Sequence, residues 1–201
     1  LAHMKEKGAK LCKVYQPEDD CPINAQRLWP FYEKAQELGI PLTLHTGVSY
    51  VCPQPNRHCH PTQLDDVALD FPDLKMIAYH AGWPYTEELI ALCGKHQNLY
   101  MSLSGIFGWY QRSPYRGYHA IGTALQWVPA DKIVLGFDLP FDDLPRVVDY
   151  IKNLDMPEEL QEKWGYAQVT DEDKAKILGL NLAKLTGIEP VKRCKPVKAA
   201  R

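Results

Sequence analysis

The sequence lacks the features that mark membrane-spanning, secreted and nucleic-acid-binding proteins. Its 201 residues contain no uninterrupted apolar run of about 18 residues, so we expect no membrane span. Basic and acidic side chains nearly balance, at 23 and 25, which leaves no basic surface of the kind that binds nucleic acid. No charged-then-apolar leader opens the chain, and this favours a cytoplasmic protein.

Closely paired cysteines are also absent. The six cysteines are scattered without a Cys-x-x-Cys pair, so we expect free thiols rather than a disulfide framework. Hydrophobic residues make up 45% of the chain and charged residues 24%, which excludes disordered, collagen-like and coiled-coil proteins. We expect one folded domain over residues 1–190 and a basic tail over 191–201. The cysteines are Cys12, Cys21, Cys52, Cys59, Cys93 and Cys194.

What the chain does contain is a regular alternation of short apolar runs with longer segments of helical periodicity. This alternation predicts βαβ units with a parallel sheet, either an open doubly wound sheet or part of a (β/α)8 barrel. The expected strands are 11–15, 40–45, 74–79, 99–103 and 132–136. The expected helices are 22–38, 62–71, 85–95, 118–127, 144–154 and 171–185.

Polar side chains follow these apolar runs, at the points where the strands are expected to end. They are His45, His80, Ser102 with Ser104, and Asp138. Ligands of parallel α/β folds bind beyond the carboxyl ends of the strands, so these side chains should converge on one rim. Imidazole and carboxylate are the usual ligands of a catalytic zinc or similar ion. We therefore predict a divalent metal site formed by His45, His80 and Asp138.

Aromatic and basic side chains come shortly after two of the strand ends. As a group the aromatic residues could line a pocket for a planar organic substrate, although each alone is as well explained by packing. Arg112 and Arg116 could pair with a substrate carboxylate, or lie on the surface. We predict substrate contacts for Trp83, Ser104, Arg112 and Arg116. The aromatic residues are Trp83, Trp109, Tyr110, Tyr115 and Tyr118.

Two further features leave alternatives open. The loop that contains Cys52, His58, Cys59 and His60 has residue types that suit zinc, but its spacing matches no structural zinc motif; a lid or plain surface is the alternative. Lys13 lies within an apolar strand, where it either points into a pocket or marks an exposed edge.

Several segments together resemble the amidohydrolase superfamily, in the branch that includes aminocarboxymuconate-semialdehyde decarboxylase and related aromatic-acid decarboxylases. The resemblance implies a (β/α)8 barrel with one divalent metal ion. His45 would then be a ligand, His80 a general acid/base or a ligand, and Asp138 a ligand that also orients or deprotonates the metal's water. The matching segments are 37–47 (ELGIPLTLHTG), 71–84 (FPDLKMIAYHAGWP), 98–105 (NLYMSLSG), 132–140 (KIVLGFDLP) and 175–181 (AKILGLN).

The sequence departs from the family pattern in two places. Phe137 stands where the family usually has Thr or Ser before the aspartate, which removes a supporting hydrogen bond. The His-x-His pair of the family's first strand is missing, so we expect this chain to supply barrel strands four to eight. Such a piece would need a partner chain, a self-association or its missing segment, and we expect a homo-oligomer.

Three functional hypotheses follow from the resemblance. The first is a hydrolase that acts on a small cyclic or carboxylated organic substrate with one divalent ion, zinc first and manganese or iron as alternatives. The second is a metal-dependent non-oxidative decarboxylase of an aromatic or unsaturated acid. The third is a truncated, non-catalytic homologue. None of the three involves nucleic acid or a membrane.

Overall fold

The computed structural model describes residues 1–18, 20–51, 55–105, 113–139 and 142–191. Its centre is a sheet of five parallel strands whose spatial order equals their order in the chain. A doubly wound sheet reverses its strand order at a switch point, so this unbroken order is that of a barrel-type sheet. The strands are β1 (Cys12–Val14), β2 (Leu42–Leu44), β3 (Met76–Ala78), β4 (Leu99–Ser102) and β5 (Ile133–Val134).

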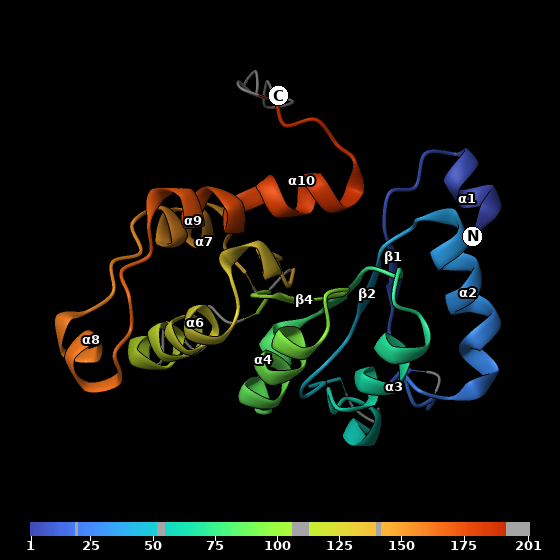
Figure 1. Cartoon of the computed structure of the whole chain (residues 1–201), viewed down its shortest axis with the longest axis horizontal. Helices are drawn as coiled ribbons and strands as arrows, with labels where there is room; N and C mark the ends of the chain where they lie inside the picture. Colours follow the sequence, from blue (N-terminus) through green and yellow to red (C-terminus); the bar gives the residue numbers. More distant parts are fainter. Residues whose placement is uncertain (19, 52–54, 106–112, 140–141, 192–201) are drawn as a thin grey trace.

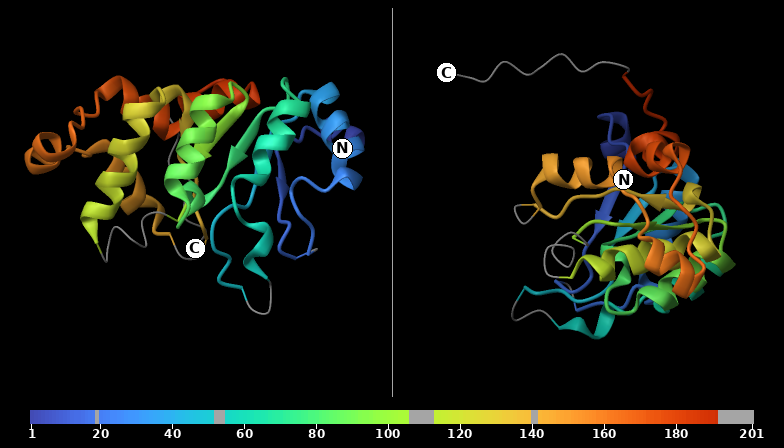
Figure 2. Two further views of the ribbon diagram at one scale, coloured as in Figure 1. Left: turned by 60° about the horizontal axis from the view of Figure 1, so that its bottom comes forward. Right: turned by 90° about the vertical axis from the view of Figure 1, so that its left-hand side faces the viewer.

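The strands are apolar because helices cover one face of the sheet. Figures 1 and 2 show α2, α3, α4 and α6 side by side along it, in this order. Leu42, Leu44, Met76 and Leu99 are completely buried, and burial of each such side chain contributes about 1.5–3 kcal/mol. The covering helices are α2 (Trp29–Leu38), α3 (Gln63–Asp70), α4 (Thr86–Lys95) and α6 (Pro114–Trp127).

The remaining helices lie before β1 and after β5, and the 3-10 turns lie between these two strands. Four short 3-10 turns occur among the described residues: η1 (Gln26–Leu28), η2 (Asn56–His58), η3 (His80–Gly82) and η4 (Ala130–Lys132). The helices are α1 (Ala2–Glu6), α7 (Leu144–Lys152), α8 (Glu158–Trp164), α9 (Asp171–Ala175) and α10 (Asn181–Thr186), and one π-helical segment, η5 (Lys176–Leu180), joins α9 to α10.

Four helices differ from the sequence-based prediction, and one of them is α6, which was expected over 118–127 and begins at Pro114. The helix expected from residue 22 begins at Trp29, because Ala25 is extended and Pro30 occupies the first turn, where its missing N–H costs nothing. The helix expected over 171–185 is interrupted by η5. Helix α8 was not predicted. Two predictions about helix ends are confirmed: α2 ends at Gly39 in the left-handed conformation, and Thr170 and Asp173 form the expected capping box.

The structure confirms the fold class: the chain supplies five βα units of a TIM-barrel type of fold. Cys12, Cys21, Cys59 and Cys93 are free thiols, as predicted. Cys52, Cys194 and nearly all of the predicted basic tail lie outside the described residues. Within the described part of the chain, no helix combines the length and the apolar character needed to cross a membrane.

Candidate functional site

Two of the predicted site residues, His45 and His80, are in direct contact. His45 follows β2, and His80 lies two residues beyond β3, so the parallel register brings both to the carboxyl end of the sheet. His80 Nε2 lies 3.1 Å from His45 Nδ1, and the two ring centroids are 4.7 Å apart. Two imidazoles that share one hydrogen bond are a coupled unit, which the spacing in sequence alone did not reveal.

The second nitrogen of His80 fixes the direction of this hydrogen bond. His80 Nδ1 lies 3.2 Å from the backbone oxygen of Ser104 and 3.3 Å from Ser104 Oγ; because the backbone oxygen can only accept, the hydrogen bond to it places a proton on Nδ1. Burial lowers the pKa of His80, with Lys13 lowering it further, so the ring is neutral. Its Nε2 therefore accepts a hydrogen bond from His45 Nδ1–H.

This arrangement leaves a bare lone pair on His45 Nε2. The atom is buried and has no hydrogen-bond partner among the described residues. Burial, followed by the effects of His80 and Lys13, lowers the pKa of His45 to about 3, so it is neutral at ordinary pH. A neutral imidazole with its other nitrogen engaged in a hydrogen bond is the state in which histidine binds metal ions.

Asp138 lies beside His80, beyond the end of β5. A Cβ atom added to Gly105 would stand 3.1 Å from His80 Nδ1 and 3.6 Å from Asp138 Oδ2, so both groups border the same small volume. The donor types fit a divalent ion. However, the described residues contain no group of three or more His, Cys, Asp or Glu side chains that could hold one. The ligand set His45, His80 and Asp138 therefore stays a prediction.

Asp142 holds the backbone of Asp138 in place. Its Oδ2 accepts hydrogen bonds from the backbone N–H of Asp138, at 2.5 Å, and of Gly105, at 3.4 Å. Burial raises the pKa of Asp142. The sequence analysis did not predict a role for Asp142. The one indication in the sequence is its position, four residues after Asp138 and beyond Pro140.

His80 also has a strained backbone. Its φ is +59° and that of Ala81 is +47°, a region that costs residues with side chains of order 1–3 kcal/mol each. The surroundings hold this conformation: the His80 N–H donates to Ser104 Oγ at 3.3 Å, and Ala81 is completely buried. Ser104, predicted to contact substrate, is itself completely buried and positions His80 in this structure.

Lys13 combines the two open alternatives: the residue is exposed on the outer strand β1, while its buried ammonium end lies near enough to His45 and His80 to act on them. Its Nζ lies 3.7 Å from the ring centroid of Tyr79, the residue before His80. Burial lowers the pKa of Lys13 to about 8, and Asp138 opposes the shift, so Lys13 is mainly cationic at neutral pH. No carboxylate of the described residues forms an ion pair with it.

Two residues after β1 support His45, and neither was predicted. The Tyr15 ring packs edge-on against His45 with centroids 4.8 Å apart. Gln16 is buried, and its amide nitrogen donates to the backbone oxygens of His45 and His58. Gln16 therefore links the end of β2, at His45, to the loop that contains His58 and His60.

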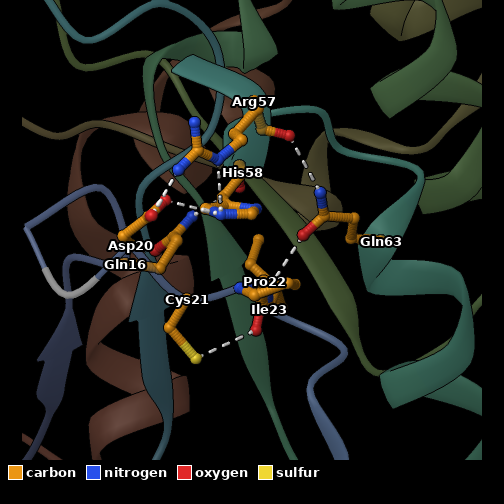
Figure 3. Close-up of polar contacts among 8 residues, drawn as sticks. All are labelled: Gln16, Asp20, Cys21, Pro22, Ile23, Arg57, His58 and Gln63. Atoms are coloured by element: carbon orange, nitrogen blue, oxygen red, sulfur yellow. Dashed lines mark hydrogen bonds and ion pairs between the residues drawn. The ribbon is translucent and has the colours of Figure 1, made fainter. Parts of the chain in front are cut away.

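That loop is tied to the segment after β1. Figure 3 shows Arg57 and His58 converging on Asp20; His58 Nε2 lies 2.9 Å from Asp20 Oδ1, and Arg57 forms an ion pair with the same carboxylate. The Gln63 side chain accepts a hydrogen bond from Ile23 N at 2.9 Å and donates one to Arg57 O at 3.3 Å. His58 therefore helps to join this loop to the segment after β1 through its contact with Asp20.

The other predicted substrate contacts lie elsewhere. Trp83 and Arg116 line a hollow between α4 and α6, together with His119. Arg112, Trp109 and Tyr110 lie outside the described residues.

The low pKa of His45 predicts a pH effect on stability. Between pH 6.5 and about 3 the unfolded chain binds a proton at His45 that the folded chain does not. The free energy of unfolding of the metal-free protein should therefore fall by about 1.4 kcal/mol per pH unit as the pH drops below 6.5, from this residue alone. Urea titrations at pH 7 and pH 5 measure it. His45→Asn should flatten the slope and His3→Asn, at an exposed site, should not; equal slopes in all three proteins would contradict the account.

A family model described as amidohydrolase matches residues 1–188. No curated protein sequence matches significantly. An uncharacterized TIM-barrel protein from Bordetella bronchiseptica has a similar structure, with a TM-score of 0.72 and 23% identity over 93% of this chain and 61% of its own.

Two further solved structures have named activities. A dihydroxybenzoic acid decarboxylase from Polaromonas, solved with manganese and 2-nitroresorcinol, has a TM-score of 0.57 and 17% identity over 85% of this chain and 57% of its own. A probable 2-pyrone-4,6-dicarboxylic acid hydrolase from Acinetobacter baumannii, solved with citric acid, has a TM-score of 0.61 and 14% identity over 92% and 67%. The chain spans about three fifths of the length of such structures. These likenesses support the fold, and the family match, which covers nearly the whole chain, shows that the protein belongs to the amidohydrolase family.

Proposed function

We propose that this chain acts in metal-dependent hydrolysis of a small carboxylated organic substrate, with His45, His80 and Asp138 at the reaction centre. The buried Nε2 of His45, to which none of the described residues forms a hydrogen bond, carries the proposal, because a bare imidazole lone pair is costly to bury unless something binds it. We propose zinc as the ion, with manganese or iron as alternatives, since these donors suit all three.

The bound ion would supply a Lewis acid and lower the pKa of a water molecule. His45 would hold it through Nε2, and Asp138 through its carboxylate. His80 has both ring nitrogens in hydrogen bonds, to His45 and Ser104. Those bonds favour a role in moving protons over a role as ligand, because Nδ1 carries a hydrogen and the lone pair of Nε2 already accepts the hydrogen bond from His45. Asp138, which borders the same volume as His80, would accept the proton of the attacking water.

Lys13 supports a carboxylated substrate. Its ammonium group stands against Tyr79 without an ion-pair partner among the described residues, close enough to His45 and His80 to lower their pKa values and close enough to Asp138 to be affected by that carboxylate. A substrate carboxylate would complete its pairing. The same cation favours a second candidate, non-oxidative decarboxylation, in which Lys13 would hold the acid group near the proton carried by His80.

A panel of lactones, esters and hydroxybenzoates, scored for acid formation and for carbon dioxide release, tests the proposal. Hydrolysis of at least one carboxylated lactone or ester is expected, and Lys13→Met should raise KM for it about tenfold with kcat little changed, since it removes an anchoring contact. Lys13→Arg should retain most of the affinity. Carbon dioxide release instead would favour decarboxylation. Turnover of no compound by metal-loaded protein would favour the non-catalytic homologue.

We also propose self-association into a homo-oligomer. Among the described residues β1 pairs only with β2 and β5 only with β4, so both outer strands present unpaired backbone groups. Sedimentation analysis should give a mass above that of one chain; a monomer at all concentrations would contradict this proposal.

A further inference from the structure

The hollow lined by Trp83 and Arg116 lies between the start of α4 and the first half of α6, and none of His45, His80 and Asp138 lines it. Its volume is about 650 Å³, within the range of small-molecule sites. Trp83, Pro84 and Ala120 form the apolar part of its wall. Its charged and polar part consists of Glu87, Glu88, Arg116, His119 and Thr123. The two helices lie side by side in Figures 1 and 2.

The imidazole of His119 is held in one orientation. Its Nδ1 lies 2.5 Å from the hydroxyl of Tyr166, which is 2.8 Å from Thr123 Oγ1. The Trp164 ring packs edge-on against the imidazole at 5.0 Å. These contacts leave Nε2 as the ring nitrogen that no described residue binds, on a residue that lines the hollow.

Gly122 leaves space for the Tyr166 ring that holds His119. A Cβ atom at this position would lie 2.8 Å from Tyr166 Cε2 and closer still to two other ring atoms. Only glycine therefore allows the Tyr166 ring to lie against α6 and reach His119. Tyr166 is 4% exposed, so the arrangement belongs to the packed interior and is not an accident of surface side chains.

The charges of the hollow are separated by helix. Arg116 stands one turn before His119 on α6, which places two donor groups on that wall. Glu87 and Glu88 lie in the first turn of α4. No ion pair within 4.0 Å joins either glutamate to Arg116 or to another described residue. One wall thus favours an anion and the other a cation, and the Trp83 indole lines the same hollow.

We propose that this hollow binds a zwitterion of amino-acid to dipeptide size with an apolar side chain. The ligand's carboxylate would pair with Arg116 and with the Nε2–H of His119, and its ammonium group with Glu87 and Glu88. Its side chain would pack on Trp83. The proposal goes beyond the hydrolase function and does not require it, because it uses none of His45, His80 or Asp138.

Calorimetric titration of the whole chain with three probes tests the charge arrangement. The probes are L-phenylalanine, N-acetyl-L-phenylalanine, which lacks the cation, and L-phenylalaninamide, which lacks the anion. Wild-type protein should bind phenylalanine about tenfold more tightly than either blocked probe, since each lost charged contact is worth about 1.4 kcal/mol or more. No binding of phenylalanine, or equal binding of all three, would overturn the proposal.

Variants assign the binding to this hollow. Arg116→Gln should weaken phenylalanine binding about tenfold and leave phenylalaninamide binding unchanged, because the amide has no carboxylate to lose. Tyr166→Phe should weaken phenylalanine and N-acetyl-phenylalanine alike by releasing His119. Arg146→Gln, at an exposed position of α7, is the matched control and should bind as wild type does. Asp138→Asn should also bind normally; if it abolishes binding while Arg116→Gln does not, the ligand occupies the strand-end site and the proposal is wrong.

Discussion

Asp138→Asn is expected to lower kcat/KM for any substrate that the protein hydrolyses by about 10²–10⁴-fold. Asparagine has nearly the same shape but neither carries a charge nor accepts a proton, and general acid–base contributions have this magnitude. The backbone of Asp138 is held through its own N–H and C=O by Asp142, so the substituted chain should keep its fold. Initial-rate kinetics with the substrate found in the panel measure the effect.

The matched control for this variant is Asp149→Asn. Asp149 is exposed on α7, so its substitution removes the same charge without touching the strand ends. It should leave kcat/KM within about twofold of wild type, as expected of a surface change. Retained activity in Asp138→Asn would remove Asp138 from the reaction centre, while equal losses in both variants would indicate a general effect of charge.

Gly47→Ala is expected to destabilise the protein by about 2–5 kcal/mol. Gly47 follows His45 and Thr46 with a φ of +76°, which costs alanine about 1–2 kcal/mol. A Cβ atom there would also lie 2.8 Å from the backbone nitrogen of Trp83 and closer to its oxygen. That crowding adds about 1–3 kcal/mol. Because a domain is stable by only about 5–15 kcal/mol, the loss should be plain in urea unfolding.

Gly94→Ala provides the control at a helical glycine. Gly94 lies in α4, and a Cβ atom there would meet nothing nearer than 3.7 Å. Alanine should therefore leave stability unchanged or raise it by up to about 1 kcal/mol, through its better helix propensity. Similar unfolding midpoints for both variants would show that the segment after β2 does not approach Trp83 as described.

The strands were predictable because each is an apolar run that ends in a polar residue. The runs before His45 and His80 are buried on the helix side, and this burial is the cause of their composition. Gly39 likewise predicted the end of α2, since it adopts the left-handed conformation that favours glycine. The family resemblance then supplied what periodicity could not, namely the choice of a barrel over a doubly wound sheet.

The helices after β5 were less predictable. Helix α8 is only seven residues long, and its single buried position, Leu160, gives no periodic signal. The interruption between α9 and α10 lies within an otherwise helical pattern. In both places packing against neighbouring elements decides the backbone, and a local pattern does not contain that information.

Only the position of the candidate site was predictable. The rule that ligands bind beyond strand ends placed His45, His80 and Asp138 together, but not the hydrogen bond between the two imidazoles. That bond depends on the left-handed backbone of His80 and on the Ser104 carbonyl, both properties of the folded chain. The pairing of Gln16 with His45 was equally hidden, because nothing in a glutamine after a strand indicates its partner.

Metal content per chain tests the central claim most directly. Elemental mass spectrometry of protein purified without chelator, then soaked in zinc or manganese and desalted, would compare wild type with His45→Ala and Asp138→Asn. The account predicts about one ion per wild-type chain, held by a single site of the kind that uses His and carboxylate donors, and a clear loss in both variants. Wild-type protein that takes up no metal, or variants that retain it in full, would contradict the assignment of His45 and Asp138 as its ligands.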